Sequence, residues 1–336
     1  MGRVHLLSSA TRTTRRLPPV ARALRERDER RARTAEVHAQ LAAAQARVAE
    51  LEATVGAYTL YPPGHFYSPV PNLDDVARRP DPQAQPGGGI DPHGVDLRID
   101  AQVELLGRLG PEFDDWPYAA SPAGLRYAPD NDYFGHTDGK LWYGLLRLLK
   151  PRRVVEVGSG WSTALVLDTV ARHDLDVELT CIEPFPDRLL SLSSADDRAG
   201  LTLIASGVQD LAPSPAGVAP WDALEAGDVL FIDSTHVAKY QSDVHTLFLQ
   251  VLPTLRSGVW VHVHDIAFPF EYPRPWILEG RAWNEAYLLN AMLIETTRWE
   301  IALWPNLLWN RRPDAMSAAL GPDTRVDGAS FWMRRS

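Results

Sequence analysis

The stretch Val154-Val155-Glu156-Val157-Gly158-Ser159-Gly160 decides the fold. It begins as a short apolar run of mostly β-branched residues, a pattern typical of a strand buried on both faces. It then turns on two glycines and enters a segment that can be helical. Glycines let the backbone approach a ligand closely, and a helix N-terminus presents free N–H groups. The stretch therefore predicts a strand, a ligand-binding turn and a helix, in that order.

The next predicted strand supplies a second signal. It runs from Glu178 to Glu183 and ends in an acid 25 positions after Gly158. An acid roughly 20 residues after such a turn is placed to bind the hydroxyls of a ribose. The turn and the acid together predict a nucleoside-binding site, and the plain alternative is a tight turn beside a surface glutamate.

These residues resemble a known family. The run from Glu156 to Gly160 resembles the first motif, E/D-x-G-x-G, of class I S-adenosylmethionine-dependent methyltransferases. A dinucleotide site would have a third glycine where Thr163 stands, which favours S-adenosylmethionine over NAD. The resemblance spans residues 150 to 335. It implies cofactor contacts from Glu156, Gly158, Ser159, Gly160, Glu183, Gln209 (or its neighbour Asp210) and Asp233.

Seven predicted strands alternate with helices over the rest of the chain. They run from Arg153 to Val157, Glu178 to Glu183, Leu201 to Ala205, Val229 to Asp233, Val259 to His264, Glu300 to Trp304 and Ser330 to Arg334. This pattern predicts an α/β fold with a doubly wound, Rossmann-like, mostly parallel seven-stranded sheet. The last two strands are expected to form an antiparallel edge. Ligands of such sheets bind at the carboxyl ends of the strands.

Composition excludes several classes of partner. The chain has 336 residues and a formal net charge of −9, which gives no reason to expect nucleic acid. No apolar run reaches the roughly 18 residues of a membrane helix, so we expect no membrane partner and a cytoplasmic protein. The single cysteine, Cys181, cannot form an internal disulfide, and its place in a predicted buried strand indicates an inert core thiol.

The N-terminal part divides into three segments before the predicted methyltransferase domain at 138–336. Residues 1–20 are predicted to be a disordered basic tail, 21–60 a coiled-coil-like helix, and 61–137 a cap or linker region. The helix carries a heptad seam at Val37, Leu41, Ala44, Val48, Leu51, Val55 and Tyr58. We expect this seam to form a homo-oligomer, or to pack on the body of the protein. The aromatic loop His65-Phe66-Tyr67 is equally consistent with a lid and with simple packing.

Histidines and acids follow two neighbouring strands. Asp233 and His236 come at the end of the fourth strand, and His264 and Asp265 at the end of the fifth. One interpretation is a divalent metal, Mg, Mn or Fe, bound by Asp233, His236 and Asp265. Ile266 departs from the metal-binding pattern of catechol-type relatives, in which an acid or amide follows the strand-five acid.

The other interpretation is metal-free catalysis. His264 or His236 would act as the general base, and Asp233 would attract the cationic sulfonium. A third possibility is that the histidines only tie neighbouring strand ends together.

The predicted function is S-adenosylmethionine-dependent O-methylation of a small metabolite, at a natural-product or sugar hydroxyl or at a carboxyl group. Residues such as Glu271, Arg281, Trp283 and Asn284 follow strand five, where the resembled family commonly covers its acceptor. The alternatives are other metal-dependent chemistry, such as oxygenation, and a non-catalytic cofactor-binding or scaffolding protein on the same fold.

Overall fold

The computed structural model of the protein describes residues 19–58, 60–120, 124–212, 218–321, 325 and 327–336. The chain forms two compact units, Met1–Asn72 and Leu73–Ser336. The predicted tail at 1–20 lies almost entirely outside the described residues. The second unit contains the sheet, so everything that follows on the functional site concerns that unit alone.

The described part of the first unit is dominated by one helix. Helix α1 (Pro19–Tyr58) is 40 residues long and begins and ends close to the predicted bounds of 21 and 60. Seam residues Val37, Leu41, Val48 and Leu51 are 47–54% exposed. In the loop after α1, the ring of Tyr61 stacks on His65 with centroids 4.7 Å apart.

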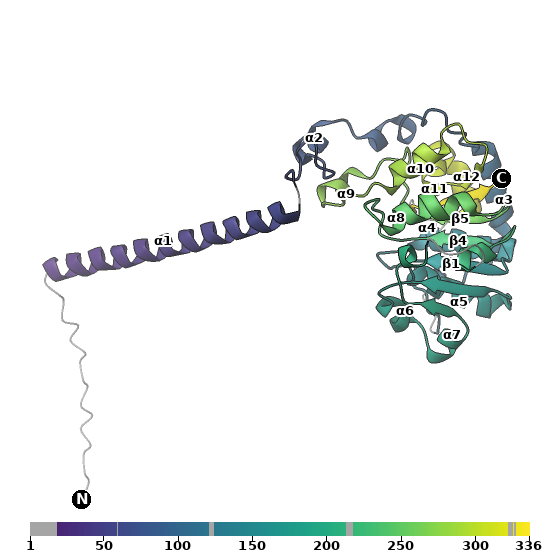
Figure 1. Cartoon of the computed structure of the whole chain (residues 1–336), viewed down its shortest axis with the longest axis horizontal. Coiled ribbons are helices and arrows are strands. Elements are labelled where there is room, and N and C mark those ends of the chain that lie inside the picture. The colour runs from purple at the N-terminus through teal and green to yellow at the C-terminus, as the bar shows by residue number, and fades with distance from the viewer. Residues whose placement is uncertain (1–18, 59, 121–123, 213–217, 322–324, 326) are drawn as a thin grey trace, which may run out of the picture. The chain divides into compact units, whose positions relative to one another are not determined.

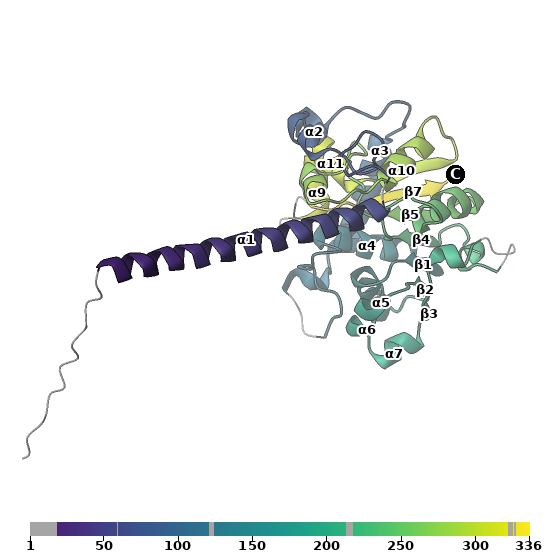
Figure 2. The same ribbon diagram turned by 60° about the vertical axis from the view of Figure 1, so that its left-hand side comes forward.

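The sheet of the second unit confirms the predicted fold (Figures 1 and 2). Its strands are β1 (Arg153–Val157), β2 (Glu178–Ile182), β3 (Thr202–Ile204), β4 (Val229–Ile232), β5 (Trp260–Val263), β6 (Trp299–Leu303) and β7 (Phe331–Arg335). Their order is β3-β2-β1-β4-β5-β7-β6. β7 runs antiparallel to both β5 and β6. The antiparallel strand therefore lies between β5 and β6, one position inside the edge.

Alternate residues of the central strands feed two hydrophobic cores, one on each face of the sheet. Val155 and Leu230 belong to one core, which also holds Val244, Leu247 and Leu289 from helices. Val154 and Phe231 belong to the other, with Leu141, Trp142 and Leu165 from helices. A strand that is buried on both faces has a continuous run of apolar residues. These strands could therefore be predicted from the sequence.

Helices cover both faces of the sheet. They are α2 (Leu73–Arg78), α3 (Ile99–Leu109), α4 (His136–Leu149), α5 (Trp161–His173), α6 (Asp187–Leu192), α7 (Ala195–Ala199), α8 (Asp243–Thr246), α9 (Arg274–Leu278), α10 (Glu285–Leu293), α11 (Pro305–Arg311) and α12 (Pro313–Leu320). Short 3-10 turns stand at Pro82–Ala84, Pro86–Gly88, Gly110–Phe113, Pro117–Ala120, Val208–Asp210, Pro220–Ala223 and Leu252–Thr254, and a π-helical turn at Leu247–Val251. None of the described helices combines the length and apolar character that a bilayer span requires.

Two features differ from the expected organisation. Leu106 and Leu109 of α3 are at most 1% exposed, so part of the predicted linker at 61–137 belongs to the core of the second unit. Helices α11 and α12 were not expected, although each begins with a proline at its first position. Proline is favoured there because its missing N–H would be unpaired in any case.

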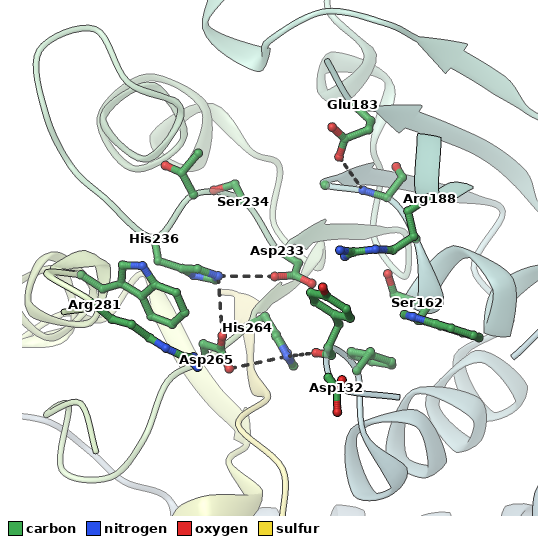
Figure 3. Close-up of a pocket in the computed structure, with 18 of the residues that line it drawn as sticks. Asp132, Ser162, Glu183, Arg188, Asp233, Ser234, His236, His264, Asp265 and Arg281 are labelled. Atoms are coloured by element: carbon green, nitrogen blue, oxygen red, sulfur yellow. Dashed lines mark hydrogen bonds and ion pairs between the residues drawn. The ribbon is translucent and has the colours of Figure 1, made fainter. Parts of the chain in front are cut away.

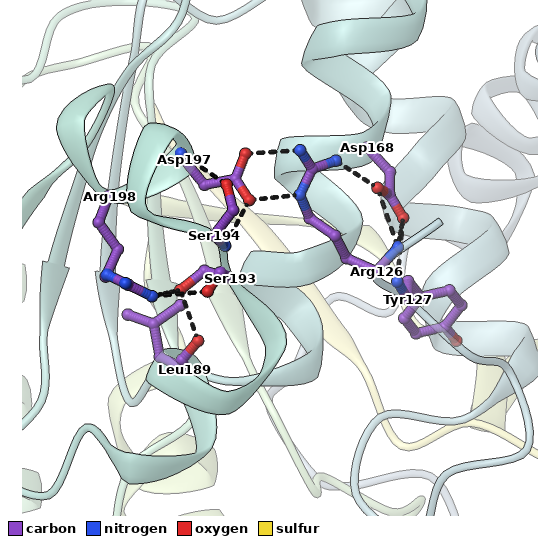
Figure 4. A network of polar contacts seen from close by, with 8 residues as sticks. All are labelled: Arg126, Tyr127, Asp168, Leu189, Ser193, Ser194, Asp197 and Arg198. Carbon is purple, nitrogen blue, oxygen red and sulfur yellow. Dashed lines mark hydrogen bonds and ion pairs between the residues drawn. The ribbon is translucent and has the colours of Figure 1, made fainter. Parts of the chain in front are cut away.

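A polar network ties the segment before α4 to the helices beside it (Figure 4). The buried carboxylate of Asp168 on α5 accepts hydrogen bonds from the backbone N–H groups of Arg126 and Tyr127 and from the hydroxyl of Tyr118. The guanidinium of Arg126 bridges Asp168, at 2.8 Å, and Asp197 on α7, at 2.5 Å. This network fixes the start of the segment that ends in Tyr133 and Phe134.

Replacing Arg126 by Met should destabilise the second unit. The change leaves the buried Asp168 without its charged partner, and we expect a loss of roughly 2–4 kcal/mol. The loss is below that of a fully buried pair because 27% of the Arg126 side chain is exposed. Arg172→Met, which removes a 44% exposed arginine of α5 that pairs with Asp115, should change the free energy of unfolding little. Equal losses in the two variants, measured by urea denaturation, would contradict this role.

The same network predicts a pH dependence. The hydrogen bond from Arg126 holds the pKa of Asp197 below its ordinary value. Because the folded pKa is the lower one, the stabilisation is fully present above the ordinary aspartate value and is lost as pH falls from that value through the lowered folded pKa. The stability difference between wild type and Arg126→Met should therefore shrink in acid.

We propose that α1 pairs with the α1 of a second copy through its exposed seam. Leu41→Glu combined with Leu51→Glu should lower the particle mass measured by light scattering, because charges at seam positions oppose coiled-coil pairing. Ala42→Glu combined with Ala49→Glu adds the same charge off the seam and should leave the mass unchanged. An unchanged mass in the seam variant would show that the seam does not assemble chains.

Candidate active site

A cavity of about 530 Å³ opens at the carboxyl ends of β1, β2, β4 and β5 (Figure 3). Its walls come from the glycine turn, the loops after the strands, the Tyr133 segment and the chain around α9. The lining residues are Asp132, Tyr133, Phe134, Gly158, Ser159, Gly160, Trp161, Ser162, Glu183, Arg188, Asp233, Ser234, Thr235, His236, His264, Asp265, Trp276, Arg281 and Trp283. The structure thus brings most of the predicted site residues to one place.

The glycine turn is fixed by the end of β4. Gly158 has φ +85°, and a Cβ there would lie 1.7 Å from the carbonyl oxygen of Asp233. The backbone N–H of Asp233 donates to the carbonyl of Val157 at 2.9 Å, and that of Gly158 to Ile182 at 3.1 Å. Only glycine fits at this position, for both its backbone conformation and its contact.

Glu183 stands at the end of β2, as predicted. Its carboxylate accepts hydrogen bonds from the backbone N–H groups of Ser159, at 3.1 Å, and Phe185, at 2.8 Å. The side chain therefore supports the glycine turn and also faces the cavity. Each carboxylate oxygen has more than one lone pair, so both can still accept a ligand hydroxyl.

Glu156 and Gln209, both within the described part of the chain, do not line the cavity. Glu156 is 1% exposed and accepts hydrogen bonds from the hydroxyls of Ser162 and Thr163, both at 2.5 Å. Burial raises its pKa to about 7, although these two bonds oppose the rise. In this structure Glu156 ties β1 to the first turn of α5. A direct cofactor contact from Glu156 or Gln209 stays a prediction.

His236 is the centre of the predicted cluster. Its Nδ1 lies 2.9 Å from Oε2 of Glu285, and its Nε2 lies 3.5 Å from Oδ1 of Asp233 and 3.7 Å from Oδ2 of Asp265. Burial lowers the pKa of His236, but the hydrogen bonds with Asp233 and Glu285 outweigh it and hold the pKa well above its ordinary value. The acid side chains around His236 therefore favour its protonated form.

The second histidine of the cluster, His264, is also buried. Its Nε2 lies 3.2 Å from the carbonyl oxygen of Tyr133 and 3.7 Å from Oδ1 of Asp265. Burial lowers its pKa, yet the charges of Asp233 and Asp265 raise it above the ordinary value. By contrast, burial together with the charge of His264 holds the pKa of His262 well below its ordinary value. His262 stacks on Phe231 inside the sheet, outside the cavity lining.

Asp233 is the anion at the centre of the cavity. Burial raises its pKa, but the charges of His264 and His236 outweigh burial and lower it below the ordinary value. In Figure 3 its carboxylate lies between Glu183 on one side and Arg281 on the other. A cationic group bound at the glycine turn would therefore meet a carboxylate that stays ionised.

The residues predicted to bind a metal, Asp233, His236 and Asp265, do come together. However, among the described residues no group of three or more His, Cys, Asp and Glu side chains has an arrangement that could hold a metal ion. The Nε2 of His236 already lies 3.5 Å from Asp233 and 3.7 Å from Asp265, and their neighbourhood favours its protonated form. The arrangement as it stands does not fit a metal, and we derive no step through one; Mg, Mn or Fe binding stays a prediction.

Two residues that shape the site, Arg188 and Glu285, were not predicted as site residues. The guanidinium of Arg188, on α6, lies 3.5 Å from the ring centroid of Tyr133 and covers the turn beside Gly160. Glu285 at the start of α10 orients His236, 49 positions earlier in the chain. An acid at the start of an apolar helix was the available signal for Glu285. Arg188 gave no signal, because it looks like a surface residue of a short helix.

The comparisons with known proteins agree with this geometry. Residues 155–266 match the family model of a methyltransferase domain. An uncharacterized protein of Archaeoglobus fulgidus is 32% identical over 135 residues, which are 39% of this chain and 61% of that protein. The chain thus spans about three fifths of the length of this curated relative.

Solved structures of methyltransferases are also similar. The O-methyltransferase TomG of Streptomyces achromogenes, in complex with S-adenosylmethionine, is 17% identical, with 70% of this chain and 88% of that chain covered and a TM-score of 0.39. A methyltransferase of Podospora anserina bound to S-adenosylhomocysteine is 16% identical, with 73% and 90% covered and a TM-score of 0.37. At TM-scores this low, these likenesses say nothing about function.

The family match and the sheet agree in the class of fold that they indicate. A seven-stranded sheet in the order β3-β2-β1-β4-β5-β7-β6, with a glycine turn after β1 and an acid after β2, is the framework of a class I methyltransferase. The second unit of this protein therefore has a Rossmann-like methyltransferase fold, and residues 155–266 within it match the family model of a methyltransferase domain.

Proposed function

We propose that the protein is an S-adenosylmethionine-dependent methyltransferase that acts on an oxygen of a small molecule. One observation carries this proposal. A single cavity runs from the glycine turn and Glu183 to the cluster around His236, so a cofactor site and a proton-accepting site share one space. A methyl transfer to oxygen needs both within reach of one another, because it is an in-line displacement that releases a proton.

The cofactor end of the cavity is built for a nucleoside and a cation. Glu183 is placed to accept the ribose hydroxyls, and the N-terminus of α5 offers N–H groups to a carboxylate. The ionised Asp233 attracts a sulfonium charge. When bound, S-adenosylmethionine supplies an electrophilic methyl group at this place. The residues of the chain then have to orient an acceptor oxygen and remove its proton.

His236 is the best-placed base. Glu285 holds its Nδ1, and its Nε2 faces the cavity beside Asp233 and Asp265. An imidazole whose far nitrogen is held by a carboxylate is the usual arrangement of a general base. Its raised pKa makes it a strong base that becomes available as the pH rises. His264 remains a second candidate for this role.

The cofactor assignment is tested by calorimetry with S-adenosylhomocysteine. Glu183→Ala removes charge-assisted hydrogen bonds worth about 1.5–3 kcal/mol, so affinity should fall by roughly tenfold or more. Glu178→Ala, at the exposed start of the same strand, should bind as the wild type does. Equal affinity of both variants, each shown to be folded by circular dichroism, would remove Glu183 from the cofactor site.

The base assignment is tested by the pH dependence of turnover. The rate should rise with pH through an inflection above the ordinary histidine value of about 6.5, because the neutral form of His236 is the active one. Glu285→Gln removes a carboxylate that raises the pKa of His236, so the inflection should move to lower pH. His236→Ala should lower the rate with little effect on cofactor affinity.

Chelation separates this mechanism from the metal alternative. Without a metal, turnover should survive dialysis against a chelator, and elemental analysis should find no bound ion. Loss of activity on chelation, with recovery on addition of Mg, Mn or Fe, would instead establish Asp233, His236 and Asp265 as ligands. Cofactor binding with no transfer to any acceptor would favour the non-catalytic alternative.

A further inference from the structure

The wall of the cavity opposite the cofactor end carries a cation that lies beside two indoles, whose ring centroids are 5.5 Å apart. The guanidinium of Arg281 lies 4.6 Å from the ring centroid of Trp276 and 5.1 Å from that of Trp283. All three residues line the cavity. A guanidinium lying over aromatic faces keeps its N–H edge available, and that edge matches the two oxygens of a carboxylate.

The chain around Arg281 is tied to the catalytic cluster. The backbone N–H of Arg281 donates to the carbonyl of Trp276 at 3.0 Å, which closes a tight loop. The backbone N–H groups of Asn284 and Glu285 donate to the carbonyl of His236 at 3.1 and 3.2 Å. The ring of Trp283 lies 4.4 Å from the ring of His236. The backbone that carries Arg281 is therefore joined by hydrogen bonds and ring contacts to the loop that carries the proposed base.

The present ion pair of Arg281 is one that a ligand can replace. Its guanidinium lies 3.1 Å from Oε2 of Glu279, and the two side chains are 39% and 56% exposed. Exposed pairs of this kind are worth little because water screens them. A ligand carboxylate inside the cavity would be better shielded from water and would have both indoles beside it.

We propose that the acceptor is a small hydroxylated carboxylic acid whose carboxylate binds Arg281 while its hydroxyl faces His236. This inference rests on the proposed function of the same cavity. It makes Arg281, together with Trp276 and Trp283, the determinant of substrate class. A planar carboxylate suits the planar guanidinium edge better than a tetrahedral phosphate does.

The test is a binding measurement on the full chain saturated with S-adenosylhomocysteine. The probes are 3-hydroxybenzoate, its neutral analogue 3-hydroxybenzamide, and 3-hydroxyphenyl phosphate, measured by calorimetry and ligand-observed NMR. We expect the benzoate to bind at least about tenfold more tightly than the amide, as for a charge-assisted pair. Arg281→Gln should abolish this preference. Arg256→Gln, which removes a 59% exposed arginine that pairs with Glu225, should retain it.

A second variant, in which Arg281 is kept, tests the same proposal without removing the arginine. Glu279→Gln removes the competing carboxylate, so the benzoate should bind more tightly and the amide should bind as before. The proposal is overturned if the amide binds as well as the benzoate, if the preference survives Arg281→Gln, if the phosphate binds most tightly, or if the benzoate does not bind at millimolar concentration. Absence of S-adenosylhomocysteine binding in the same calorimeter would instead be a failure of the proposed function.

Discussion

The contact between Gly158 and the carbonyl of Asp233 is the constraint on which the site depends. Because the backbones of the two strand ends nearly touch, the turn after β1 and the loop after β4 open into the same space. A side chain at position 158 would have to displace Asp233, and with it the loop that carries His236. The proposed cofactor turn and the proposed base are therefore held in register by one close approach of backbone.

The pKa values of the histidines and acids that line the cavity also depend on each other. The carboxylates of Asp233 and Glu285 hold the pKa of His236 well above its ordinary value, and the neighbouring His264 and His236 in turn hold the pKa of Asp233 below its ordinary value. A cationic ligand at the glycine turn would lower the proton affinity of these histidines, since like charges in a buried site repel strongly. Binding at the cofactor end thus favours the neutral base that the transfer needs.

The sequence predicted the parts of this site that follow from local pattern. Buried parallel strands are continuous apolar runs, and residues after them gather at one edge of the sheet, so the positions of Gly158, Glu183, Asp233 and His264 could be inferred. The direction in which a side chain points could not be inferred from this pattern. Glu156 belongs to the motif, yet it points under the turn to Ser162 and Thr163.

Contacts between distant segments were beyond sequence reasoning for a similar reason. Glu285 meets His236 only because the start of α10 packs against the loop after β4, and Arg126 meets Asp168 of α5 and Asp197 of α7 only through tertiary packing. The position of β7 between β5 and β6 is also decided by tertiary packing, because the hydrophobic pattern of the last two strands is compatible with either order in the sheet.

A structure of the protein with S-adenosylhomocysteine tests the central claim most directly. The account predicts that both ribose hydroxyls contact Glu183, that the amino acid part passes the turn at Gly158, and that the sulfur faces Asp233 and the space beside His236. A ligand bound elsewhere, or one whose sulfur points away from the His236 cluster, would contradict it.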